Sequence, residues 1–448
     1  MKFITNNNNT YFIDPKGRVT LENFTPNNYS SNNNIEFVEL TNEDIKLQLA
    51  NLKQLTLEVT DACNLSCTYC AYGEFYCDYD QRKNTNLQYE KAIKIIDFLN
   101  DYWNSELNMS NRKNVYISFY GGEPLLNIKL IRKIINYVKN IKNQSRFYTF
   151  SMTTNGMLLD KHIDYLVEND FNLLVSLDGD YNNNVYRVDK KGRSSFKKIT
   201  DNIELVSQKY PVFFDTNINF NAVLHNKNSV AEIYSFFKDK YNKIPSISEL
   251  NDMGIRPDKK KQFLDTHKNY YESLSQTNNP LEIEKEMFIK SNTYQTLSTY
   301  IHRYSGFVFD DYNDLIFGKS DKLIPTGTCI PFSKRMYITV NGKILPCERI
   351  GQQFALGTIT NDKIELDIPM IVAKYNNYLN KIKTQCTQCY VARACTMCIF
   401  NIDSIENKCS CNNFTNSKNF VMDIASQVEF LEHNPLDYAK IMNEIIID

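Results

Sequence analysis

Three cysteines near the N-terminus have a spacing that suits metal chemistry. They stand in the segment Cys63-Asn-Leu-Ser-Cys67-Thr-Tyr-Cys70, directly after an alternating apolar run at 55–60 that predicts a buried strand. Three thiolates can hold a [4Fe–4S] cluster and leave its fourth iron free for another ligand. A structural zinc ion would instead need a fourth protein ligand. The spacing therefore favours a reactive cluster, and a zinc knuckle or unrelated buried thiols are the alternatives.

This loop resembles that of the radical S-adenosylmethionine (SAM) enzymes, which combine the same spacing with an aromatic residue before the third cysteine. The resemblance implies that Cys63, Cys67 and Cys70 bind the cluster, and that Tyr69 lies against the adenine of SAM. It also implies that the bound cofactors produce a 5′-deoxyadenosyl radical, which takes hydrogen from an unreactive substrate carbon. The protein then positions the cofactors and excludes water.

The elements that must position this loop are strands alternating with amphipathic helices. After the first strand, further strands are predicted at 115–120, 147–153, 172–177, 215–223 and 244–250, the last one disfavoured by Pro245. Helices are predicted at 128–141, 161–168 and 229–240. Such alternation is typical of βα units around a parallel sheet. We therefore expect an α/β fold with a partial (β/α)6 radical SAM barrel.

Polar residues and glycines follow these strands at their carboxyl ends, where ligands collect in parallel sheets. The segments are Gly121-Gly-Glu-Pro124, Thr153-Thr-Asn-Gly-Met157 and Ser176-Leu-Asp-Gly179. A single Gly-Gly is more often only a turn, but here several ends agree. The resemblance implies that the first motif binds the methionine amino group and that the others bind the ribose and the methionine carboxylate. The candidate SAM-binding residues are Tyr69, Gly121, Gly122, Glu123, Pro124, Thr154, Asn155, Ser176, Asp178, Arg187 and Asn217.

Eight more cysteines lie between residues 329 and 411. They resemble the SPASM extension of radical enzymes that modify peptides, which carries two auxiliary [4Fe–4S] clusters. The resemblance implies one cluster on Cys386, Cys389, Cys395 and either Cys409 or Cys411. It implies another on Cys329, Cys347 and Cys398, with an open iron unless Cys411 fills it. Two residues, where the family usually has three, separate Cys395 from Cys398, and two zinc sites are the alternative.

Net charge, apolar segments and cysteine content limit the partners and the cell compartment that we expect for this protein. The 448 residues carry a net charge of -1, which gives no electrostatic reason to expect nucleic acid or a membrane as partner. The N-terminus has no apolar signal region, and no apolar run reaches membrane-spanning length. We therefore expect a cytoplasmic protein whose twelve cysteines serve metal binding, with Cys77 as a bystander.

Five segments are expected along the chain. Residues 1–52 hold a hairpin and a helix that could serve as a reduced leader-binding element, and residues 53–255 form the barrel. Residues 256–328 are a helical connector, 329–414 are the SPASM domain around a hairpin at 336–345 with an Asn-Gly turn, and 415–448 are a helical tail.

For function, the resemblance implies a peptide maturase that installs an oxidative cross-link, a thioether or a carbon–carbon or carbon–oxygen bond, in a ribosomally made precursor peptide. Its partners would be that peptide and a low-potential electron donor such as ferredoxin or flavodoxin. The runner-up is an anaerobic sulfatase-maturase-like enzyme that makes formylglycine, in which Glu348 takes the place of the relatives' catalytic Asp base. A non-catalytic metal-binding or peptide-binding protein is the third alternative.

Overall fold

The computed structural model describes residues 1–14, 17–22, 35–109, 114–141, 146–304, 308, 315–316, 323–402, 405 and 410–445. The chain divides into two compact units that are interleaved along the sequence. The barrel unit comprises Glu43–Lys290 and Ile330–Ile368, and the helical unit comprises Met1–Asn42, Ser291–Cys329 and Pro369–Asp448. The segment 330–368, expected within the SPASM domain, thus belongs to the barrel unit.

The barrel unit is built on one ten-stranded sheet with the order β13-β12-β11-β10-β4-β5-β6-β7-β8-β9. Strands β4 to β9 are parallel and follow one another in chain order. On the other side of β4, β10 pairs in parallel, and β10 to β13 continue as antiparallel neighbours. Because the sheet has two ends, it is an open, partial barrel, and the predicted α/β class is confirmed. The strands are β4 (Gln54–Thr60), β5 (Asn114–Gly121), β6 (Phe147–Thr154), β7 (Asn172–Ser176), β8 (Ile218–Val223), β9 (Ser246–Ser248), β10 (Arg335–Ile338), β11 (Lys343–Leu345), β12 (Gly357–Ile359) and β13 (Ile364–Glu365).

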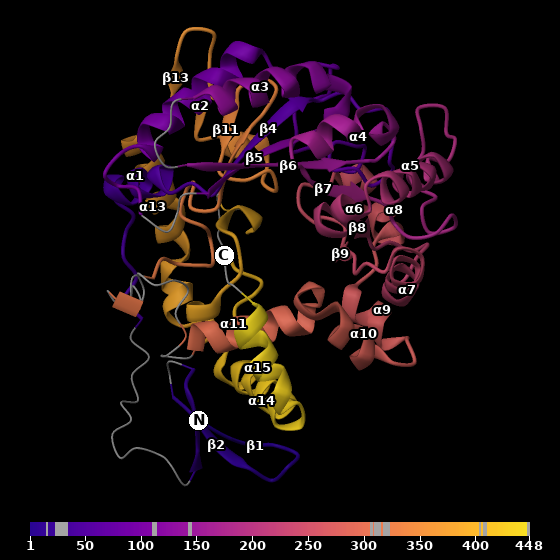
Figure 1. The fold of residues 1–448 in the computed structure, drawn as a ribbon. Coiled ribbons are helices and arrows are strands. Elements are labelled where there is room, and N and C mark those ends of the chain that lie inside the picture. The colour runs from indigo at the N-terminus through magenta and orange to yellow at the C-terminus, as the bar shows by residue number, and fades with distance from the viewer. Residues whose placement is uncertain are drawn as a thin grey trace. The chain divides into compact units, whose positions relative to one another are not determined.

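Helices connect the parallel strands and cover the sheet. Helix α3, between β5 and β6, buries an apolar stripe of residues three and four apart, as an amphipathic helix does. Helices α2, α3 and α4 run beside the strands β4 to β6 (Figure 1). The helices of this unit are α1 (Asn42–Ala50), α2 (Tyr89–Trp103), α3 (Ile128–Asn140), α4 (Leu159–Glu168), α5 (Phe196–Lys209), α6 (Pro211–Asn217), α7 (Val230–Tyr241), α8 (Lys260–Thr266), α9 (Tyr270–Ser275) and α10 (Pro280–Met287).

One predicted strand is wrong in its first part. The expected strand at 215–223 begins only at Ile218, because residues 211–217 form helix α6. Pro211 occupies the first turn of that helix, where its fixed φ and missing N–H are tolerated. Asn217 is consequently the last residue of a helix and precedes β8.

The helical unit joins the two ends of the chain. It contains a three-stranded antiparallel sheet, β1 (Lys2–Ile4), β2 (Thr10–Ile13) and β3 (Val19–Leu21), and the helices α11 (Asn292–Tyr304), α13 (Ile368–Thr387), α14 (Ser417–His433) and α15 (Pro435–Glu444). The predicted N-terminal hairpin is β2–β3, although Pro15 and Lys16 in its turn lie outside the described residues.

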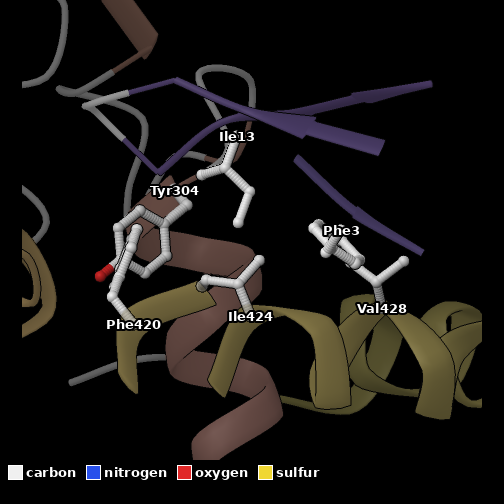
Figure 2. Close-up of a cluster of buried hydrophobic side chains, with 6 residues drawn as sticks. All are labelled: Phe3, Ile13, Tyr304, Phe420, Ile424 and Val428. Carbon is white, nitrogen blue, oxygen red and sulfur yellow. The ribbon is translucent and has the colours of Figure 1, made fainter. Parts of the chain in front are cut away.

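A hydrophobic cluster fixes this small sheet to helices α11 and α14 (Figure 2). Phe3 and Ile13 from the sheet pack with Tyr304 at the end of α11, and with one face of α14. That face presents Phe420, Ile424 and Val428, which are spaced four residues apart and therefore lie in one row.

Among the described helices, none is both long and apolar enough to cross a membrane.

Candidate active site

The predicted cluster loop leaves β4 at the carboxyl edge of the parallel sheet. Its backbone is held against a second loop, since Ser66 N donates to Val188 O at 2.8 Å and Thr68 N donates to Tyr186 O at 3.3 Å. Burial raises the pKa of Cys67 to about 12, so a thiolate without a bound metal is unfavourable there. A bound metal would reverse this preference, because cysteine binds metals as the thiolate.

Polar donors face the sulfur atoms of this loop. Leu65 N donates to Cys63 Sγ at 3.4 Å, and Asn155 Nδ2 lies 3.8 Å from the same sulfur. Arg82 Nη2 donates to Cys70 Sγ at 3.5 Å. Hydrogen bonds and a cation directed at thiols fit anionic thiolates, so these residues suit an iron–sulfur cluster.

Gly121 and Gly122 allow the next strand end to dock against the start of the loop. Gly122 N donates to Thr60 O at 2.9 Å. A Cβ atom on Gly121 would lie 2.1 Å from Thr60 O, and one on Gly122 would lie 2.1 Å from Ala62 O. Gly121 also has a φ of 138°, which side chains disfavour. Both glycines are therefore required for this close backbone approach.

Glu123 is fully buried and ties together two neighbouring strand ends. Its Oε1 accepts from Leu125 N at 3.1 Å and from Thr154 Oγ1 at 2.8 Å, while Oε2 accepts from Asn155 N at 2.7 Å. Asn155 Nδ2 in turn donates to Asn64 Oδ1 at 2.7 Å, within the cluster loop. Burial raises the pKa of Glu123 to about 7. The carboxylate oxygens are thus engaged by the protein, and Asn155 links the end of β6 to the cluster loop.

Tyr69 points into a buried polar cluster. Its hydroxyl donates to Asp178, its ring stacks on His225 with centroids 5.8 Å apart, and the Arg187 guanidinium lies 5.5 Å from its centroid. Asp178 Oδ1 forms an ion pair with Arg187 at 3.0 Å and also accepts from Val223 N. Burial alone would raise the pKa of Asp178, but Arg187 and the hydrogen-bond donors hold it below its usual range.

Asn217 lies at the opposite edge of the sheet from the other candidate SAM-binding residues at the strand ends. Ser176 ends β7 at the same edge as the cluster loop. Asn217 precedes β8, so it lies at the amino-terminal edge, where it donates to Asp170 Oδ1 at 3.0 Å and to Phe171 O at 3.2 Å. This position does not support the predicted SAM contact of Asn217.

Glu348, the candidate base, is engaged by a cation. It forms an ion pair with Arg335 of β10, and Cys347 Sγ lies 3.6 Å from its other carboxylate oxygen. Its side chain is 16% exposed. Because this ion pair occupies the carboxylate, Glu348 could accept a proton from a substrate only if the pair opened.

Four of the C-terminal thiols gather in the helical unit. Cys386, Cys389, Cys395 and Cys411 line one cavity, with Thr326 and Phe414 among its other walls. Burial raises the pKa of Cys386 to about 12, and the other three thiols add to the shift. Gln385 holds Cys411 in place through hydrogen bonds to its backbone N and O atoms.

This donor set suits an iron–sulfur cluster. Among the described residues, no three His, Cys, Asp or Glu side chains are gathered closely enough to hold a single ion. A four-iron cluster does not require such a grouping, because each thiolate binds a different iron.

The other C-terminal thiols are less fully defined. Cys329 and Cys398 both belong to the helical unit. Burial raises the pKa of Cys398, and the nearby Cys329 thiol adds to this shift. Cys347 belongs to the barrel unit, so its grouping with those two residues stays a prediction. Cys409 lies outside the described residues. Cys77 is exposed.

Two residues of the site escaped the sequence analysis. His225 follows β8 at the carboxyl edge of the sheet. Its signal in the sequence is a polar residue just after the predicted strand at 215–223. Arg82 lies twelve residues beyond Cys70, in a segment with no recognisable pattern, so nothing in the sequence placed it beside the thiol.

Comparison with known proteins supports this interpretation of the barrel unit. The model of the Radical SAM superfamily matches residues 57–238. A cysteine-type anaerobic sulfatase-maturating enzyme from Clostridium novyi is 32% identical over 215 residues, which are 46% of this chain and 54% of that protein. The radical SAM cyclopropyl synthase TigE from Paramaledivibacter caminithermalis is 25% identical over 231 residues, 50% of this chain and 44% of that protein. The chain therefore spans about half the length of the curated relatives it matches.

A solved structure shares the fold. Native anSMEcpe with bound AdoMet and Kp18Cys peptide superposes with a TM-score of 0.54 at 19% identity, and the match covers 88% of this chain and 99% of that one. At this sequence identity the match shows a shared fold. Because it covers 88% of this chain, the match includes residues outside the barrel unit.

Removing the cation from the buried pair should destabilise the protein in a pH-dependent way. In Arg187→Gln, Asp178 loses its partner, which typically costs about 3–5 kcal/mol at pH 7. The depressed pKa of Asp178 means that the pair stabilises the fold above the carboxyl's unfolded pKa, near 4, and that this contribution is lost as pH falls. The deficit measured by denaturant unfolding of the SAM-free protein should therefore be full at pH 7 and shrink as the pH falls below about 4.

Arg193→Gln is the matched control, because its ion pair with Asp189 is largely exposed on the arginine side and should contribute about 1 kcal/mol or less. Equal losses in the two variants, or a deficit for Arg187→Gln that grows toward low pH, would contradict the assignment.

Proposed function

We propose, from the premise that residues 57–238 form a radical SAM domain, that this chain is a radical SAM enzyme acting on a peptide. The observation that carries the proposal is the cluster loop itself. Three thiols with the family spacing leave β4 at the ligand-binding edge of a parallel sheet, and backbone, amide and guanidinium donors face two of them.

The chain's own residues would have distinct tasks at this site. Cys63, Cys67 and Cys70 would hold a [4Fe–4S] cluster that, with SAM, supplies radical chemistry. Because the oxygens of Glu123 are engaged by Leu125, Thr154 and Asn155, we assign recognition of the methionine amino group to the backbone around Gly121 and Gly122. Ser176 at the end of β7 remains a candidate for the ribose or the carboxylate.

The four-thiol cavity of the helical unit would hold an auxiliary [4Fe–4S] cluster. Its four ligands would be Cys386, Cys389, Cys395 and Cys411. A cluster with four protein thiolates has no vacant iron, so its role would be to accept an electron during substrate oxidation. We keep Cys329, Cys347 and Cys398 as the proposed ligands of a further cluster. Cys411 is then not available as its fourth ligand, which would leave one iron open.

We propose an oxidative cross-link in a ribosomally made peptide as the product. One hydrogen atom would pass from a substrate carbon to the 5′-deoxyadenosyl radical, and a proton would leave the partner group. A carbon–sulfur, carbon–carbon or carbon–oxygen bond would form, and an auxiliary cluster held by the C-terminal cysteines would supply a site for the remaining electron. A low-potential donor such as ferredoxin or flavodoxin would reduce the cluster of the barrel unit. If Cys411 serves the four-thiol site, an open iron on the other cluster would favour a thioether.

A second candidate is oxidation of one Ser or Cys to formylglycine. It is favoured by the likeness to the Clostridium novyi sulfatase-maturating enzyme and by the fold shared with anSMEcpe. The pairing of Glu348 with Arg335 counts against a free base at that position. The two candidates differ in product, since only formylglycine contains an aldehyde.

Mass spectrometry of a peptide product decides between them. A Cys-containing precursor peptide is incubated anaerobically with the reconstituted chain, SAM and a reductant. We expect a product that has lost two hydrogens, has no aldehyde that reacts with a hydrazide and, for a thioether, has one fewer thiol open to alkylation. A hydrazide-reactive product would establish the formylglycine candidate instead, and an unchanged peptide with no 5′-deoxyadenosine would contradict both.

Iron content tests the thiol assignment. Three four-iron clusters require about twelve iron and twelve sulfide per chain after anaerobic reconstitution. Cys411→Ala should lose up to about four of these irons, because Cys411 lines the four-thiol cavity, whereas Cys409→Ala should keep them all. The reverse result would exchange the two cysteines. Two zinc ions with about four iron in the unaltered chain would show a structural zinc region.

A further inference from the structure

Arg82 makes an unusual contact beside the cluster loop. Its Nη2 donates to Cys70 Sγ at 3.5 Å, and its guanidinium carbon lies 4.3 Å from the centroid of the Tyr72 ring. Its Nε is buried and makes no hydrogen bond in the described structure. The planar group therefore lies between an aromatic face and a sulfur atom.

The Tyr72 ring that supports Arg82 is itself fixed. Its hydroxyl lies 2.7 Å from that of Tyr337 on β10, and Tyr337 is 2% exposed. The ring also packs on Tyr79, with centroids 5.2 Å apart. Stacking on such a ring restricts a guanidinium to one plane, so Arg82 is directed at Cys70 by packing and is not simply a solvated side chain.

Among the described residues Arg82 forms no ion pair, and its charge is only the last of several influences on the pKa of the buried Glu58 carboxyl. Other arginines of the barrel unit, such as Arg187, Arg256 and Arg335, form ion pairs with Asp or Glu. In the part of the chain that the structure describes, the contacts of Arg82 are instead the sulfur and the ring. An arginine guanidinium stays protonated in proteins, so Arg82 places a positive charge beside the Cys70 sulfur. The positive charge therefore acts on the cluster ligands.

We propose that Arg82 is a positioning and charge-tuning residue for the cluster of the barrel unit. Its N–H group orients the Cys70 sulfur, and its charge stabilises the reduced cluster, which carries one more negative charge than the oxidised form. Reduction potentials of such clusters depend on hydrogen bonds to the sulfurs and on nearby charge. The inference rests on the proposed function, because it requires the cluster to be bound at Cys63, Cys67 and Cys70.

The test is the reduction potential of that cluster in the reconstituted full chain without SAM, measured by titration with a reductant and electron paramagnetic resonance. Arg82→Gln removes the charge and should make the cluster harder to reduce by about tenfold in the equilibrium constant, or about 59 mV for one electron. Arg82→Lys keeps the charge but not the planar fork, and should give a potential between the two. An unchanged reduction potential in Arg82→Gln would overturn the proposal. If Arg82→Gln does not retain the cluster, the decisive variant is Arg82→Lys, and an unchanged potential in Arg82→Lys would overturn the proposal.

Arg256→Gln is the matched control. Arg256 lines the same pocket as Arg82, but it pairs with Asp258, so its loss should leave the potential unchanged. An equal shift in this control would also overturn the proposal, since it would show a general effect of charge. If the proposed function itself is wrong, the unaltered chain will bind no cluster that depends on Cys63, Cys67 and Cys70. That result differs from a bound cluster whose potential does not respond to Arg82.

Discussion

The buried carboxylate of Glu123 is the constraint on which the candidate active site depends. It accepts hydrogen bonds from the backbone of its own turn and from both Thr154 and Asn155 at the end of the next strand. Asn155 then reaches Asn64 and the Cys63 sulfur in the cluster loop. Since Gly121 and Gly122 dock on the loop's first residues, three strand ends and the thiols form one connected structure. A change at Glu123 would therefore disturb the thiols without touching them.

The cluster loop and the parallel strands could be predicted because their signals are local. The cysteine spacing, the apolar periodicity and the Gly-Gly-Glu-Pro turn each lie within a few residues of the chain. The role of Glu123 could not be predicted in the same way. The motif predicts contact with the methionine amino group, but residue type alone does not show that burial and three donors make Glu123 a link between strands.

Features that depend on distant contacts were not predictable. The pairing of β10 with β4 joins residues about 280 positions apart, and no local pattern announces it. Arg82 and His225 acquire their places from packing against Tyr72 and Tyr69. Asn217 was misplaced because a short helix replaced the start of a strand. For the auxiliary site, the sequence left Cys409 and Cys411 as alternatives, and the cavity contains Cys411 among the described thiols.

The most direct measurement of the central claim is formation of 5′-deoxyadenosine. The reconstituted chain is incubated with SAM and a strong reductant, and the products are separated by liquid chromatography. If Cys63, Cys67 and Cys70 hold the cluster that cleaves SAM, the unaltered chain forms 5′-deoxyadenosine, and the triple Ala variant forms none while keeping its remaining iron. Full cleavage by the triple variant would contradict the account.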